Sequence, residues 1–206
     1  ERSSGDGVEI TPKRGKPGIN VVVKPGTKQT VHIPVIITRS GLIDEVHNTI
    51  EIGAGADIYL VAGCGIHNPG DEPSRHDGIH EIFVRQGARL HYVEKHYGEG
   101  GGKGKRILNP KTVLLVEKDA YAELELLQIR GVDDTVRITG ARVEENGGVN
   151  MFERLLTSGK QSALSEVEIA LMGDDSTARI VSRSVAQESS QQIFKFRLIA
   201  HRRGRG

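Results

Sequence analysis

Apolar and polar side chains alternate along much of the chain, and the clearest example lies between residues 79 and 98. A turn at Gln86-Gly87-Ala88 divides this stretch into two alternating runs. In the second run one face carries Leu90, Tyr92 and Glu94, and the other face carries His91, Val93 and Lys95. A side-chain period of two on both sides of a glycine turn is typical of a strand, a turn and a second strand.

The same pattern recurs and predicts a protein that is nearly all β. Gly and Asp turns separate the runs, and no segment shows a period of 3.6 with helix caps. Strands are expected at residues 19–23, 31–37, 49–52, 57–62, 79–84, 89–96, 111–116, 121–129, 135–143, 149–156, 164–171, 178–185 and 192–200. Short, evenly spaced strands fit a sandwich, a barrel or a β-solenoid. The turn types lean toward the solenoid, but local periodicity leaves all three open because it does not distinguish parallel from antiparallel pairing.

Composition narrows the classes of function. The chain has 206 residues, of which 26 are Gly and 4% are aromatic, and its net charge is +1. So small a charge gives no field for binding nucleic acid or an acidic membrane surface. A single Cys excludes an intrachain disulfide framework and indicates a reducing compartment, and neither a bilayer-spanning run nor a signal peptide is visible. We therefore expect a cytoplasmic protein with no nucleic-acid or membrane partner.

Several segments, in order, resemble the SufB/SufD family of iron–sulfur cluster assembly proteins. The segments are residues 60–64, 80–88, 107–109, 126–131, 151–153 and 176–186. The resemblance implies a right-handed parallel β-helix (a β-solenoid). We expect residues 19–206 to form its core domain, and residues 1–18, which have little apolar content, to be a flexible lead-in. It further implies a scaffold, not an enzyme, that pairs with a second SufB/SufD-like subunit or as a homodimer. A SufC-like ABC ATPase would dock on a helical segment after the β-helix.

The chain departs from the family pattern where a cluster would be built. Cluster-building members carry a Cys near the position of Glu117, and their later Cys, His and Glu ligands would fall beyond Gly206. The chain begins without Met and ends in a basic Gly/Arg tail, so both ends resemble the edges of a fragment truncated at its C-terminal side. The resemblance therefore implies an iron–sulfur cluster held transiently, possibly shared between subunits, and no complete cluster site in this chain.

Cys64 and His67 are the candidate metal ligands. Their C-x-x-H spacing, in what the sequence indicates is a mobile loop over residues 63–78, would offer a soft and a borderline ligand to iron or another metal. Because one Cys is too few for a stable cluster, any cluster would be shared. The alternative is a small residue packed at the end of a strand.

His76, His80 and Glu81 suggest a different class of protein, a stand-alone β-helix or cupin-like metal-dependent enzyme. Two His and a carboxylate could form a facial metal site. However, Asp77-Gly78 between the two His indicates a turn, so surface or interface histidines are the competing interpretation. His91 and His96 are five residues apart, so they should lie on opposite faces of one strand.

The Gly- and Lys-rich run at residues 98–106 superficially resembles a phosphate-binding loop. Lys103 is followed by Gly and Lys105 by Arg, so neither stands in the Gly-Lys-Ser/Thr sequence that a P-loop requires. We therefore expect no nucleotide bound by this chain. The absence of Trp and the presence of only four Tyr also count against a polysaccharide-cleaving groove, which usually presents aromatic platforms.

Overall fold

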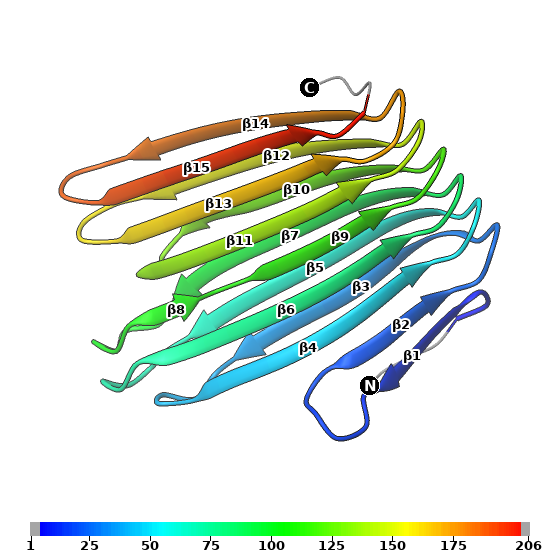
Figure 1. Cartoon of the computed structure of the whole chain (residues 1–206). Coiled ribbons are helices and arrows are strands. Elements are labelled where there is room, and N and C mark those ends of the chain that lie inside the picture. Colours follow the sequence, from blue (N-terminus) through cyan, green and yellow to red (C-terminus); the bar gives the residue numbers. More distant parts are fainter. Residues whose placement is uncertain (1–4, 203–206) are drawn as a thin grey trace.

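The computed structural model describes residues 5–202, which form two stacked sheets and no helix (Figure 1). No segment of this part is therefore a helix able to cross a membrane. The strands are β1 (Val8–Pro12), β2 (Ile19–Val23), β3 (Lys28–Ile37), β4 (Ile43–Ile52), β5 (Asp57–His67), β6 (Ser74–Val84), β7 (Arg89–Glu99), β8 (Arg106–Leu108), β9 (Lys111–Val116), β10 (Tyr121–Arg130), β11 (Asp134–Val143), β12 (Gly148–Thr157), β13 (Ser162–Leu171), β14 (Thr177–Ala186) and β15 (Gln191–Ala200).

From β2 onward the chain alternates between the two sheets, with β8 and β9 together forming one pass through sheet A, so it winds as a parallel β-solenoid of about six turns. Sheet A has the order β1-β2-β4-β6-β8-β11-β13-β15, with β9 also between β6 and β11; sheet B has the order β14-β12-β10-β7-β5-β3. Every named strand pair is parallel except β1 with β2. The parallel solenoid is thus confirmed over the sandwich and the barrel.

The coils are not all of one length. Contacts between side chains stacked one coil apart join residues separated by 32 positions in the middle coils, by 27 further on, and by 29 near the end. The longer coils carry the Gly-rich loop between β7 and β8, which stacks on the loop between β5 and β6. The backbone N–H of Gly102 donates to the carbonyl oxygen of Asn68 at 3.2 Å, and that of Gly104 donates to Gly70 at 3.0 Å.

Each predicted strand is present, although most bounds differ by a few residues, and the larger differences are three. Strands β1 and β8 were not predicted, and β1 lies inside the segment expected to be a flexible lead-in. The expected mobile loop over residues 63–78 is wrong, because β5 continues to His67 and β6 begins at Ser74. Residues 1–4 of the expected lead-in and residues 203–206 of the basic tail lie outside the described residues.

The turns that lead from sheet A to sheet B stack in a column. Each turn places one residue with positive φ at its tip, namely Gly26, Gly55, Gly87, Asp119, Asn146 and Asp175. Backbone hydrogen bonds join successive tips: the N–H of Gly55 donates to Gln86 at 3.0 Å, and that of Gly87 donates to Lys118 at 3.1 Å. Gly, Asn and Asp tolerate this left-handed conformation best, so the turn chemistry fixes the sharp corner of each coil.

We expect Gly87→Ala to lower the free energy of unfolding by about 1 kcal/mol, because a Cβ strains the left-handed backbone (φ 66°) although it meets no neighbouring atom within 4 Å. Gly140→Ala in β11 is the matched control, since a Cβ there also meets nothing within 4 Å and φ is not positive. Denaturant unfolding of both variants measures the difference. Equal stabilities would contradict the role assigned to the turn column.

The interior between the sheets contains two apolar clusters. The larger lies beside the turn column and includes Ile50, Leu60, Ile82, Tyr92 and Leu124. The smaller lies toward the opposite corner and consists of Ile37, Cys64, Ile66, Leu108 and Val132. Buried polar side chains also point inward, among them Asn48, His76, His80, Glu94, His96, Gln128, Arg137, Thr139, Glu153 and Ser165. These inward polar groups are where chemistry within the solenoid must be sought.

Candidate functional site

Cys64 lies inside the solenoid, in the second half of β5. It is 4% exposed and packs with Ile66 and Leu108 in the smaller apolar cluster. Burial raises the pKa of its thiol, and the nearby carboxylate of Glu94 raises it further. At neutral pH Cys64 is therefore a protonated thiol within the interior and not a reactive thiolate on a surface loop.

His67, the other predicted ligand, points to the opposite side of β5. Its side chain is 45% exposed, and its Nδ1 lies 3.4 Å from Oε1 of Glu99 on the neighbouring β7. Residues three apart on a strand face opposite sides of the sheet. The structure therefore does not bring Cys64 and His67 together, and Cys64 instead shares its surroundings with His76, His80 and His96.

His76 and His80 both face inward from β6, and Glu81 faces outward. The turn expected at Asp77-Gly78 is wrong, because these residues continue the strand and keep the two His on one face. Glu81 lies outside sheet A, where its Oε2 is 3.0 Å from Nε2 of His47 and accepts a hydrogen bond from Thr49 at 3.3 Å. Hence the three groups of the predicted enzyme site do not converge.

A network of buried charges joins the two sheets around Arg137 of β11. Arg137 is 4% exposed and donates from Nη1 to Oε2 of Glu94 on β7. Its Nη2 lies 3.1 Å from Nδ1 of His96, and its Nε lies 3.5 Å from Oε1 of Glu153 on β12. Glu94 and Glu153 both stand beside Leu126 in sheet B, one coil to either side. Arg137 thus bridges carboxylates that are two coils apart.

Hydroxyl groups complete this network. The phenol of Tyr92 donates to Oε1 of Glu94 at 3.1 Å. The hydroxyls of Ser165 and Ser182 donate to the two oxygens of Glu153 at 2.8 and 3.2 Å. Each carboxylate therefore has a neutral donor as well as the guanidinium, as buried charges require.

The charges in this network shift the pKa of its members. Burial by itself raises the pKa of Glu94, but the neighbouring His96 and Arg137 outweigh it and lower the pKa to about 2. Burial lowers the pKa of His96 to about 3, so its imidazole is neutral at neutral pH and Arg137 carries the balancing charge. Glu94 is thus a carboxylate held within a low-dielectric interior by one guanidinium.

The outer faces of the two sheets carry partly exposed ion pairs. His91 on β7 and Glu123 and Glu125 on β10 present three possible ligand atoms within 4.8 Å of one another. Nε2 of His91 already lies 2.9 Å from Oε1 of Glu125, and Arg154 lies 3.5 Å from the other oxygen of Glu125. This cluster is partly exposed, and its side chains already contact one another and Arg154. As predicted, His91 and His96 lie on opposite faces of β7.

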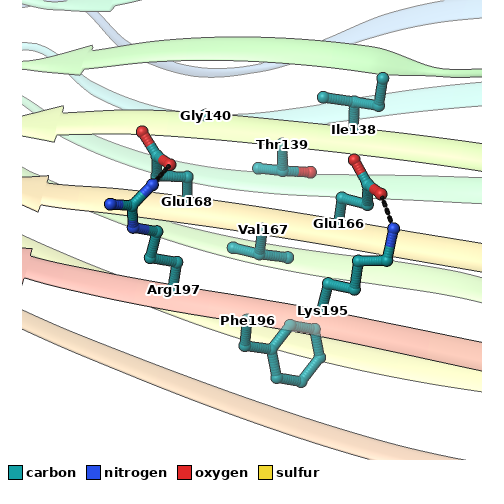
Figure 2. A pocket seen from close by; sticks show the side chains of 9 residues that line it. All are labelled: Ile138, Thr139, Gly140, Glu166, Val167, Glu168, Lys195, Phe196 and Arg197. Carbon is teal, nitrogen blue, oxygen red and sulfur yellow. Dashed lines mark hydrogen bonds and ion pairs between the residues drawn. The ribbon is translucent and has the colours of Figure 1, made fainter.

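An open hollow on the outer face of sheet A is shown in Figure 2. Two ion pairs lie across β13 and β15, with Lys195 Nζ 2.7 Å from Glu166 and Arg197 Nη1 3.3 Å from Glu168. Gly140 on β11 is the cross-strand neighbour of Glu168 and has no side chain, which leaves the hollow open at that end. Exposed ion pairs of this type contribute little to stability and are common on solvated surfaces.

Sequence comparison identifies the family to which the chain belongs. Residues 35–206 match the core domain described as SufBD, of the SUF system of iron–sulfur cluster assembly. An iron–sulfur cluster assembly SufBD family protein of Methanothermobacter thermautotrophicus is 26% identical over 178 residues, which cover 82% of this chain and 40% of that protein. One of Archaeoglobus fulgidus, with the same description, is 26% identical over 167 residues, 79% of this chain and 43% of that protein.

The chain thus spans about 40% of the length of these relatives. The matched residues begin within β3 and run through all the later coils, so the family's core domain corresponds to the solenoid itself. The chain belongs to the SufBD core-domain family of SUF-system iron–sulfur cluster assembly proteins.

Proposed function

We propose that this chain is a scaffold subunit that works with a SufC-like ABC ATPase and with a second SufB/SufD-like subunit or a second copy of itself. It acts in the cytoplasm, and the iron–sulfur cluster is its cargo, held transiently at a site shared between subunits. The observation that carries the proposal is that the described part of the SufBD core-domain match, residues 35–202, forms one continuous parallel stack. Such a stack is a rigid platform because each coil pairs along its length with the next.

The last coil of the described residues has the kind of edge that the pairing part of the proposal needs. Strand β15 pairs with β13 on one side, and Ile193, Phe196 and Leu198 on it are at least 42% exposed. A strand edge with apolar side chains is a template for adding a further strand. The edge therefore suits pairing with a second subunit. Movement of a docked ATPase would then shift one platform relative to the other.

ATP hydrolysis belongs to the partner in this proposal. The Gly-rich run that superficially resembled a phosphate-binding loop stacks its backbone against the preceding loop, and the N–H of Lys103 donates to Oδ1 of Asp71 at 3.3 Å. The predicted alternative, a metal-dependent enzyme using His76, His80 and Glu81, has no support in the geometry because Glu81 lies on the outer face.

Co-expression of the full chain with an ABC ATPase of the same organism tests the proposal. We expect the ATPase to copurify, and ATP hydrolysis to require it. The ATPase expressed without this chain is the control, and it should not be retained. Failure of the full chain to recover any ATPase, under conditions that preserve weak complexes, would overturn the proposal.

A further inference from the structure

On the outer face of sheet B, the imidazole of His91 faces two carboxylates. Its Nε2 lies 2.9 Å from Oε1 of Glu125 and 3.7 Å from Oε1 of Glu123. The three residues offer one donor atom each within 4.8 Å of one another. His67 and Glu99, on the same face of sheet B, form a simpler contact of one imidazole with one carboxylate. The cluster around His91 is therefore more than the usual His–Glu pair of this fold.

The pairing of two strands fixes where the three side chains start. His91 on β7 is the direct cross-strand partner of Glu123 on β10. Glu125 lies two residues further along β10, so it is on the same face of the sheet. Neighbouring strands are about 4.8 Å apart, and residues two apart on a strand are about 6.6 Å apart. Three donors thus arise from the corners of a small triangle, on a hydrogen-bonded backbone and not on a loop.

Each carboxylate is held from behind by a neighbouring donor. The hydroxyl of Tyr121 donates to Oε2 of Glu123 at 3.4 Å. Nη1 of Arg154 donates to Oε2 of Glu125 at 3.5 Å. These contacts use the second oxygen of each group and leave both Oε1 atoms directed at the imidazole. Outer partners that orient ligating side chains in this way are usual at metal sites in proteins.

Apolar groups border the cluster. Val93 lies two residues after His91 on the same face of β7, directly opposite Glu125, and is only 3% exposed although it points out of the solenoid. The ring of Tyr59 packs edge-to-face against the imidazole, with the ring centroids 4.7 Å apart. Apolar neighbours reduce the screening by water, so a cation and carboxylates attract each other more strongly here than on a bare polar surface.

The charges of the cluster are not balanced by its cations. In the described part of the chain, Glu123 contacts the imidazole and the hydroxyl of Tyr121 but no Lys or Arg. Arg154 is the one Lys or Arg in contact with Glu125, and its own side chain is 53% exposed. Two carboxylates this close repel each other. A divalent cation between them would offset both negative charges.

We propose that Nε2 of His91 and one oxygen each of Glu123 and Glu125 bind a divalent transition-metal ion on the outer face of sheet B. One imidazole and two carboxylates suit zinc, ferrous iron, cobalt and manganese. Bonds of about 2.0–2.2 Å place neighbouring ligand atoms about 3.0–3.5 Å apart. The contacts of 2.9 and 3.7 Å therefore need only small side-chain shifts to accept the ion. The open side of the face leaves further coordination positions to water.

Binding replaces a proton by the ion. A carboxylate only accepts hydrogen bonds, so in the contact with Glu125 the proton is on Nε2 of His91. When the ion arrives, this proton leaves to solvent and the lone pair of Nε2 forms the bond to the metal. Solvent supplies a proton to Nδ1 of the same ring, which stays neutral overall.

Titration of the metal-free full chain with Zn²⁺ alone, followed by isothermal titration calorimetry, tests the site. We expect His91→Ala to bind one ion fewer per chain than the wild type. Glu123→Gln and Glu125→Gln should each weaken the binding of that ion at least ~10-fold. Arg154→Met should tighten it severalfold, because it removes a positive charge beside the site. A network of ordinary surface ion pairs would show none of these changes.

The His67–Glu99 contact provides the matched control. His67→Ala and Glu99→Gln remove the same kinds of side chain from the same face of sheet B, and both variants should bind Zn²⁺ as the wild type does. An unchanged number of ions in His91→Ala would overturn the proposal. An equal loss in His67→Ala would do the same, since it would show that any exposed imidazole accounts for the binding.

Circular dichroism and the denaturation midpoint of each variant check that it is folded. The absence of saturable Zn²⁺ binding by the folded wild-type protein would equally end the proposal. The measurement needs no ATPase or second subunit, so its failure would leave the proposed scaffold function standing, and failure of copurification would leave this site standing.

Discussion

Replacing Arg137 by Met is expected to lower the free energy of unfolding by about 3–5 kcal/mol, because it leaves an unpaired charge in the interior. Glu94, the main partner, is fully buried. Without the guanidinium, its carboxylate keeps only the hydroxyl of Tyr92 as a hydrogen-bond donor among the described contacts. Glu153 is less affected, since Ser165 and Ser182 continue to donate to it.

The double variant Arg137→Met, Glu94→Leu provides the control. Removing both charges and filling the space with apolar side chains avoids the uncompensated carboxylate, so the double variant should be more stable than Arg137→Met alone. Denaturant unfolding of the wild type, both single variants and the double variant gives the coupling free energy. Additive costs of the two single substitutions would show that the pair does not interact as the structure indicates.

This network explains how a polar band persists between the two apolar clusters. Arg137 arises from sheet A and its carboxylate partners from sheet B, so the ion pairs tie the two walls together across the interior. A stack of coils held only by hydrophobic side chains could slide or flatten. Because Arg137 must reach Glu94 and Glu153, these ion pairs fix which coil of sheet A faces which coil of sheet B.

Most strands could be predicted from the sequence, because each depends on a local period of two. The predicted bounds of β2 and β9 agree with the structure, and most of the others differ by a few residues. How the strands pair could not be derived in this way. A period of two is the same in parallel and antiparallel sheets, so the order of family-like segments was needed to choose the solenoid.

The error at residues 63–78 has a physical cause in glycine. Gly63, Gly65 and Gly78 indicated a loop, yet all three lie in strands β5 and β6. At Gly65 the ring of Tyr97 occupies the space that a side chain would need, and at Gly78 the two His rings converge. Local sequence cannot distinguish a glycine that bends the chain from one that admits a neighbour.

One of the buried charges, Glu94, could have been recognised in the sequence. Glu94 shares its alternating face with Leu90 and Tyr92, so a carboxylate was already placed on an apolar face. Its partner could not be found in the same way, because Arg137 lies 43 residues further along the chain. Only the stacking of coils brings the two together.

Acid is expected to destabilise the protein through Glu94. The pKa of this group is about 2 in the folded chain against an ordinary value of 4.5, so unfolding takes up a proton between these limits. The stabilisation is complete above pH 4.5 and is lost as the pH falls through 2. Since one pKa unit corresponds to about 1.4 kcal/mol, the loss from this group is about 3 kcal/mol.

The difference in unfolding free energy between the wild type and Glu94→Gln isolates this contribution. Glu94→Gln should be less stable near pH 7, because Arg137 loses one of its two carboxylate partners. The difference in unfolding free energy from the wild type should narrow steadily from pH 4.5 toward pH 2. Glu166→Gln removes an exposed carboxylate paired with Lys195, so its gap from the wild type should stay small throughout. A gap for Glu94→Gln that remains constant down to pH 2 would mean that Glu94 does not titrate as a buried, paired carboxylate.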